Sequence, residues 1–253
     1  MNEKSPLRFT VVTVFPEMIQ ESVKWGILGR AIESDLINLN VVNLREYTHD
    51  THRTTDDTIY GGGAGMVMKP EPFYEFYNDF RKGVEDPHVI FPSPQGKRFD
   101  SSVAKRLADA GEVVFFCGRY EGIDERVMDL VDEEISIGDF VTSGAELPVL
   151  IMMDAISRFK KGVVGNFESV KNDSFYNGLL DHSNYTRPRE IEGKKVPEVY
   201  LNGNHKLIRE ARLRDSLLRT ALKRPDQFTR RDFDSEEKKE LAKLITELYE
   251  NAE

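Results

Sequence analysis

Residues 113–148 read VVFFCGRYEGIDERVMDLVDEEISIGDFVTSGAELP, and the order of elements in this stretch decides the fold. An apolar run, Val113–Cys117, stops at a glycine and a charged turn, which is typical of a buried strand that feeds a loop. A short helix is expected at Glu125–Leu130, and a second apolar segment at Ile135–Ile137 leads to a turn at Ser143-Gly144. The pattern predicts strand, loop, helix, strand and loop.

The two loops of this stretch are the natural place for a site. In open α/β sheets, the loops at the carboxyl ends of parallel strands form the ligand crevice. Residues 118–124 and 138–144 are rich in glycine and charge, as such loops often are. The acidic residues 132–134, which precede the second strand, are interpreted as a solvated turn.

Strand and helix patterns also alternate on the amino-terminal side of this stretch. Phe9–Phe15 is a β-rich run, Glu17–Ala31 has apolar residues at helical intervals, and Leu36–Leu44 alternates like a strand. A strand at Val89–Phe91 and a helix at Ser101–Ala110 add a further unit. Strands spaced by helices predict an α/β fold with a mainly parallel sheet that is covered on both faces.

The periodicity is helical again at Pro70–Phe80, Leu147–Phe159, 207–222 and 236–249. Residues 45–65 and 162–180 lack periodicity, and the second of these segments is interpreted as a linker. The sequence therefore predicts a large α/β domain over residues 1–162, a linker over 163–178, and a small, mostly helical domain over 179–253.

Length and composition narrow the class of protein. The 253 residues contain no apolar run of the roughly 20 residues that a membrane helix needs, and the first residues lack the pattern of a secretory signal. These features favour a cytoplasmic protein without a membrane partner. The single cysteine, Cys117, excludes an intrachain disulfide framework. It ends an apolar run, so it is interpreted as a core residue rather than a nucleophile.

The charge is distributed unevenly along the chain. The net charge is −9, yet residues 186–231 hold 13 Lys or Arg against 6 Asp or Glu, whereas residues 1–185 hold 19 against 30. A basic segment in an acidic protein suggests a polyanionic partner such as a nucleic acid. A solvated helix face remains an alternative on charge alone.

The spacing of polar residues does not by itself reveal a reaction. A dinucleotide fingerprint starting at Gly61 fails at Met66, and there is no Walker loop or nucleophile elbow. His49 and His52 lack a third ligand at a convincing spacing for zinc. Asp154 and Arg158, four apart on one helix, are compatible with a structural ion pair, and Asp173 is compatible with a loop carboxylate or a helix cap.

Eight motifs, collinear over nearly the whole chain, closely resemble those of the bacterial tRNA (guanine-N1)-methyltransferase family, TrmD. They are THDTHRTTDDTIYGGGAGMVM (48–68), SPQG (93–96), CGRYEGIDERV (117–127), SIGDFVTSGAELP (136–148), SRF (157–159), DSF (173–175), LLDHSNYTRP (179–188) and LNGNH (201–205). Several of these strings are long and mix unrelated residue types, so a chance match is implausible.

The resemblance implies an enzyme of the SPOUT class, which transfers a methyl group from S-adenosylmethionine to N1 of guanosine 37, the guanosine 3′ of the anticodon in tRNA. It also implies that residues 1–162 contain a deep trefoil knot in the cofactor site, and that residues 179–253 bind tRNA. Carried over by motif, the residues expected to bind the cofactor are Ser93, Pro94, Gly118, Tyr120, Glu121, Ile137, Gly138, Asp139, Phe140, Val141, Thr142, Gly144 and Ala145.

The resemblance assigns the catalytic roles to Asp173 and Arg158. Guanine N1 carries a proton and is a poor nucleophile until that proton leaves, which explains the need for a carboxylate base such as Asp173. Negative charge then builds on O6, where the guanidinium of Arg158 would stabilise it.

The family is homodimeric, and the resemblance implies composite active sites in which each site is built from both chains. The candidates for tRNA phosphate contacts are Arg187, Lys206, Arg209, Arg212, Arg214 and Arg219. The resemblance also implies dependence on Mg²⁺, but the sequence designates no ligands for the ion.

Two residues depart from the family pattern. Relatives often have two glycines where this chain has Gly144-Ala145, and often have tyrosine at the position of Phe140. Two alternative functions are a non-catalytic tRNA-binding protein and a SPOUT methyltransferase that acts on another RNA base. The choice of tRNA isoacceptors is not readable from the sequence.

Overall fold

The computed structural model describes residues 5–84 and 86–250. Its elements are β1 (Leu7–Thr13), α1 (Pro16–Ser22), α2 (Gly26–Glu33), β2 (Ile37–Asn43), η1 (Leu44–Tyr47), β3 (Asp56–Thr58), β4 (Met66–Met68), α3 (Pro70–Phe80), β5 (His88–Arg98), α4 (Ser101–Ala108), β6 (Glu112–Phe116), η2 (Glu125–Leu130), β7 (Glu133–Ser136), α5 (Glu146–Ser157), α6 (Phe167–Asn172), β8 (Glu190–Ile191), β9 (Lys194–Lys195), η3 (Glu198–Tyr200), α7 (His205–Lys223), α8 (Pro225–Phe228) and α9 (Ser235–Glu250). None of the helices in the described ranges is long and apolar enough to cross a membrane. The chain divides into two compact units between Phe167 and Glu168, inside the segment interpreted as a linker.

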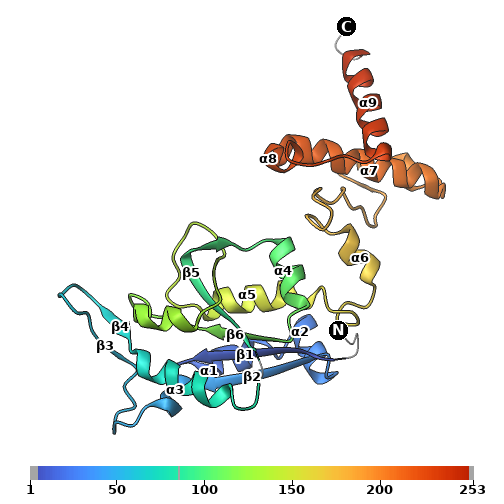
Figure 1. Ribbon diagram of the computed structural model, residues 1–253. Helices are drawn as coiled ribbons and strands as arrows, with labels where there is room; N and C mark the ends of the chain where they lie inside the picture. The colour runs from blue at the N-terminus through green and yellow to red at the C-terminus, as the bar shows by residue number, and fades with distance from the viewer. Residues whose placement is uncertain (1–4, 85, 251–253) are drawn as a thin grey trace. The chain divides into compact units, whose positions relative to one another are not determined.

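A five-stranded sheet forms the centre of the first unit (Figure 1). Its order is β2-β1-β6-β5-β7, and every neighbouring pair is parallel. All residues of β6 are buried, as expected for a parallel strand that is covered on both faces. The predicted α/β class with a mainly parallel sheet is confirmed.

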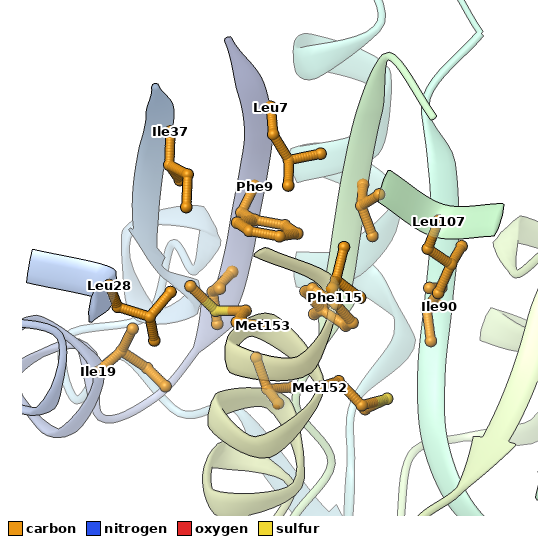
Figure 2. Close-up of a cluster of buried hydrophobic side chains, with 14 of the residues drawn as sticks. Leu7, Phe9, Ile19, Leu28, Ile37, Ile90, Leu107, Phe115, Met152 and Met153 are labelled. Atoms are coloured by element: carbon orange, nitrogen blue, oxygen red, sulfur yellow. The ribbon is translucent and has the colours of Figure 1, made fainter. Parts of the chain in front are cut away.

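The two faces of the sheet carry separate cores because successive side chains of a strand point to opposite faces. Phe9 and Phe115 face the layer of α1, α2, α4 and α5, where they meet Met152 and Met153 of α5 (Figure 2). The opposite face packs against α3 and η2. The apolar faces of these helices explain why the alternating pattern of strand and helix could be read from the sequence.

Some local expectations were wrong. The single helix predicted over Glu17–Ala31 is two helices, because the chain turns at Gly26, which has φ 72°. The segment 162–180 is not irregular throughout, since it contains α6, and residues 45–65 contribute β3 to a hairpin with β4.

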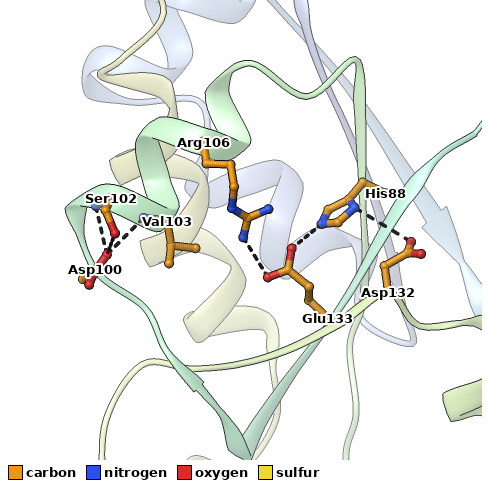
Figure 3. A network of polar contacts seen from close by, with 7 residues as sticks. All are labelled: His88, Asp100, Ser102, Val103, Arg106, Asp132 and Glu133. Carbon is orange, nitrogen blue, oxygen red and sulfur yellow. Dashed lines mark hydrogen bonds and ion pairs between the residues drawn. The ribbon is translucent and has the colours of Figure 1, made fainter.

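The acidic residues 132–134 also do not form a solvated turn (Figure 3). Glu133, at the start of β7, accepts a hydrogen bond from Arg106 of α4 at 2.7 Å and is hydrogen-bonded to Nε2 of His88 of β5 at 2.7 Å. Asp132 accepts a hydrogen bond from the main-chain N–H of Val89 at 2.7 Å. These contacts tie α4 and two neighbouring strands together at the end of the sheet where β5 and β7 begin.

The second unit is built on α7 and α9, which pack around Leu217 and Leu244. Leu179, from the segment before α7, completes this small core. The predicted helical character of the carboxyl-terminal part is therefore confirmed for the described residues, with the short hairpin β8–β9 as an addition.

Candidate active site

A cavity of about 250 Å³ lies at the carboxyl ends of β5, β6 and β7. Its walls come from the loops at the edge where the sequence predicts a site. Among the residues expected to bind the cofactor, those that line the cavity are Ser93, Pro94, Gly118, Tyr120, Glu121, Ile137, Gly138, Phe140, Val141, Thr142, Gly144 and Ala145. Asp139 belongs to the same loop, but it does not line the cavity and its side chain is exposed.

The β5 wall arises from a break in strand register. Pro92 and Lys97 of β5 both pair with Ile135 of β7, so the residues between them bulge from the ladder. A Cβ atom on Gly96 would lie 2.4 Å from the main chain of Glu134. Only glycine allows this close approach, which holds the bulge against β7.

Main-chain contacts join the β6 and β7 walls. The N–H of Ala145 donates to the carbonyl of Gly118 at 3.0 Å. Within the β7 loop, the hydroxyl of Ser136 donates to the carbonyl of Gly138 at 3.1 Å, and that of Thr142 donates to the carbonyl of Gly144 at 2.9 Å. The chain that leaves the edge strand β7 thus passes the end of β5 and returns to the end of β6.

The loop after β6 forms an exposed rim. Tyr120 has φ 57°, a sparsely populated conformation for a non-glycine residue and one often found at functional sites. The N–H of Glu121 donates to the carbonyl of Met66 at 3.0 Å, so this rim is held by β4.

The structure accommodates both departures from the family pattern. Ala145 has φ −85° and ψ −5°, a conformation open to any residue, so its methyl group causes no backbone strain. Phe140 is exposed, and its ring lies where a Cβ atom on Gly138 would approach it to 2.7 Å. Phe140 therefore covers the main chain of the loop.

Glu146, the first residue of α5, is a site residue that the sequence analysis missed. Its side chain is completely buried beside the cavity wall. Oε1 accepts a hydrogen bond from the hydroxyl of Thr13 at 2.6 Å, and both carboxylate oxygens accept from Nε of Arg119 at 3.2 Å. A carboxylate directly before the apolar helix was the available signal, but its partners are distant in sequence.

Burial makes the Cys117 thiol near the cavity a poor nucleophile. Burial raises the pKa of the Cys117 thiol well above its ordinary value, and the nearby Glu146 carboxylate raises it further. The interpretation of Cys117 as a core residue is confirmed by its complete burial. Within residues 5–84 and 86–250, no group of three or more His, Cys, Asp or Glu is placed to hold a metal ion.

Arg158 lies far from this cavity within its own chain. It follows the last residue of α5, whereas Ala145 precedes the first, and the 12-residue helix between them is about 18 Å long. Asp173 lies in the second unit, just after α6, where its N–H donates to the carbonyl of Val170 at 3.3 Å. The structure gathers the expected cofactor residues, but it does not bring Arg158 to them.

The six basic candidates fall into two groups. Arg187, Lys206 and Arg212 are exposed, and in the part of the chain that the structure describes no carboxylate forms an ion pair with them. The other three contact side chains of the same unit: Arg209 donates to Glu236 at 3.2 Å, Arg214 forms an ion pair with Glu247, and Arg219 donates to the hydroxyl of Ser183 at 3.0 Å. Exposed cations without a carboxylate partner are the better placed for phosphate contacts.

The sequence matches known proteins over almost its full length. The family model described as tRNA (guanine-1)-methyltransferase TrmD matches residues 7–230. Three relatives share the name tRNA (guanine-N(1)-)-methyltransferase. The protein of Thermosipho africanus is 51% identical over 242 residues, which cover 96% of this chain and 98% of the relative. That of Fervidobacterium nodosum is 49% identical over 246 residues, or 97% and 100%, and that of Thermotoga maritima is 49% identical over 244 residues, or 96% and 99%. The chain belongs to the TrmD family of tRNA (guanine-1)-methyltransferases.

Proposed function

We propose that this protein transfers a methyl group from S-adenosylmethionine to N1 of guanosine 37 in tRNA. The observation that carries the proposal is the cavity at the carboxyl ends of β5, β6 and β7, whose walls are built from the motifs that the chain shares with the family. The crossing of the chain from β7 to the end of β6 supports a SPOUT-type trefoil knot at this cavity.

The lining of the cavity suits S-adenosylmethionine. Apolar side chains such as Phe91, Ile137 and Pro148 offer flat contacts for an adenine ring. The glycine-rich loops bring main-chain amides and carbonyls to the walls, where they can bind the polar edges of adenine and ribose. When bound, the cofactor would supply an activated methyl group. The protein's task is then to align the guanine and to remove its proton.

Asp173 is proposed as the base that takes the proton from guanine N1, and Arg158 as the cation that stabilises the charge on O6. Asp173 lies in the second unit, which also carries the basic residues proposed to bind tRNA. Binding of tRNA to this unit would therefore bring the base and the substrate together.

The position of Arg158 supports the proposal of a homodimer with composite sites. Because α5 separates Arg158 from the cavity of its own chain by about 18 Å, Arg158 would act at the cavity of a second copy. Leu147 and Ile151, four residues apart on α5, are 50% and 53% exposed, as expected for an apolar face that a partner covers.

Dependence on Mg²⁺ stays a prediction, and no ligands are proposed for the ion. A cytoplasmic location is proposed because tRNA is the substrate.

Methyl transfer from labelled S-adenosylmethionine tests the proposal. The substrates are an unmodified tRNA with guanosine at position 37 and the same tRNA with adenosine there. Label in the first tRNA alone is the expected result. Label in both would support a SPOUT methyltransferase that acts on another base, and tight tRNA binding with no label would support a non-catalytic tRNA-binding protein.

A further inference from the structure

A second cavity, of about 400 Å³, lies within the second unit. It is formed by the loop at residues 182–189, by η3 and by one side of α7. No aspartate or glutamate is among its lining residues, although the chain as a whole has a net charge of −9. None of its lining residues lines the cavity that is proposed to bind the methyl donor.

Two tyrosines give the cavity an aromatic wall. The ring centroids of Tyr185 and Tyr200 are 5.4 Å apart, with an angle of 38° between the ring planes. Tyr185 is 50% exposed, so about half of its surface is accessible to a ligand. A ring held in this way offers a stacking surface for a nucleobase, and such stacking is tolerant of base identity.

Three guanidinium groups line the same cavity, namely those of Arg187, Arg189 and Arg212. In the part of the chain that the structure describes, no carboxylate forms an ion pair with any of them. This contrasts with Arg209 and Arg214 on the same helix α7, which pair with Glu236 and Glu247. Guanidinium groups that no carboxylate pairs with suit a phosphate, which they can bind through paired hydrogen bonds.

The loop that carries Tyr185 is anchored before any ligand binds. The N–H of Ser183 donates to Asp215 of α7 at 2.5 Å, and its hydroxyl accepts from Arg219 at 3.0 Å. The N–H of Leu180 donates to the hydroxyl of Thr220 at 2.9 Å. A pre-formed site loses less conformational entropy on binding, so its contacts contribute more fully to affinity.

We propose that this cavity binds one unstacked nucleotide of tRNA other than the guanosine that is methylated. The base stacks on Tyr185, and its phosphate is bound by Arg187, Arg189 and Arg212. Proteins that recognise RNA commonly stack splayed bases on aromatic side chains in this way. The inference rests on the proposed function in that tRNA is the substrate, and the methylated guanosine must instead reach the cavity of the first unit.

The test compares tRNA affinity, at one fixed salt concentration, for Tyr185→Ala, Tyr185→Phe, Arg212→Ala and the control Arg230→Ala. Arg230 is exposed, belongs to the same unit and does not line the cavity. Loss of the ring in Tyr185→Ala should raise the Kd for tRNA roughly tenfold or more, and Arg212→Ala should also raise it. Tyr185→Phe and Arg230→Ala should bind like the parent protein. Thermal unfolding checks that all four variants fold.

A set of tRNAs, each lacking one base of the anticodon loop, then locates the nucleotide. One of them should bind more weakly to the parent protein and show no further loss with Tyr185→Ala. Unchanged tRNA affinity in Tyr185→Ala would overturn the proposal. It would also be overturned if, for every tRNA of the set, the loss of affinity from the missing base and the loss from Tyr185→Ala were additive. If the parent protein methylates no tRNA but its binding still depends on Tyr185, the proposed function fails and the nucleotide site stands. If the parent protein methylates tRNA normally but its tRNA affinity does not depend on Tyr185, the proposed function stands and the nucleotide site fails.

Discussion

The carboxylate of Glu146 and the guanidinium of Arg119 form an ion pair beside the wall of the cavity at the ends of β5, β6 and β7, with 3.1 Å between Nη2 and Oε2. Glu146 is completely buried, and the Arg119 guanidinium also lies 4.2 Å from the ring centre of Phe15. With Thr13 as a second donor to Glu146, the pair connects the first turn of α5 to the ends of β1 and β6. It therefore holds in place two of the chain segments that form the cavity.

Replacement of Glu146 by alanine should lower the free energy of unfolding by about 3 to 5 kcal/mol, because it leaves the Arg119 cation partly buried and unpaired. Denaturant unfolding measures this loss. Thr13→Val removes only one donor to Glu146 and should cost less. Equal losses for the two variants would mean that the ion pair contributes little.

Gly96→Ala should lower the affinity for S-adenosylmethionine. The added methyl group would overlap the main chain of Glu134, at 2.4 Å, and push the bulge of β5 away from β7. We expect a loss of about 1 to 3 kcal/mol in the free energy of unfolding as well. Calorimetric titration with the cofactor measures the affinity. Gly111→Ala is the matched control, since a Cβ atom there meets no atom within 4 Å.

Asp173→Asn should lower the rate of methyl transfer by roughly 10²- to 10⁴-fold, the usual contribution of a positioned base. The amide cannot take the proton from guanine N1, whereas the cavity proposed to bind the cofactor lies in the other unit, so the affinity for the cofactor should not change. Single-turnover kinetics with saturating tRNA measure the rate. Asp232→Asn changes an exposed carboxylate of the same unit and should have no effect. A fully active Asp173→Asn enzyme would remove this residue from the mechanism.

Mixed dimers test whether the sites are composite. At a cofactor concentration that saturates the parent protein but not the weakened site, chains with Gly96→Ala and chains with Asp173→Asn should each have little activity alone. After they are unfolded together and refolded, half of the dimers would be mixed, and each mixed dimer would have one intact site if Asp173 acts in the second copy. Activity should then return to about a quarter of that of the parent protein. No recovery, with mixed dimers demonstrated by differential tags, would place Asp173 at the cavity of its own chain.

The network around Glu133 should contribute to stability in a pH-dependent way. Burial alone would raise the pKa of Glu133, but hydrogen bonds from Arg106 and His88 outweigh it and hold the pKa below its ordinary value of 4.5. The charged form is thus favoured in the folded state, so the stabilisation is present in full above pH 4.5 and is lost as the pH falls through the lowered folded value.

Glu133→Gln should therefore be less stable than the parent protein near neutral pH, and the difference should shrink as the pH falls below 4.5. Denaturant unfolding across this range measures it. Glu134→Gln, at the adjacent residue, provides the control. A difference that stays constant with pH would show that the side chain acts through packing alone.

Much of the fold could be predicted because each strand and helix buries one face, so its apolar residues recur at a regular spacing in the local sequence. The β-rich run of β1 and the continuous apolar run of β6 predicted parallel strands, and the structure confirms both. The expectation for Glu17–Ala31 failed at Gly26, because apolar spacing alone does not show where a helix is interrupted. The expectation for residues 132–134 failed because a run of acidic residues predicts a solvated turn when only the local sequence is considered. The partners of Glu133, Arg106 and His88, are distant in the sequence.

The sequence by itself determined the order of strands and helices, the α/β class, the basic character of the second unit and, through its motifs, the family. These properties are encoded in neighbouring residues. Only the tertiary structure decided which loops meet at the cavity, how Glu146 is paired and where Arg158 lies. Thr13 and Glu146 are 133 positions apart in the chain, and Arg158 is carried away from the cavity by the straight length of α5. Such relationships depend on the packing of distant segments, which no local pattern contains.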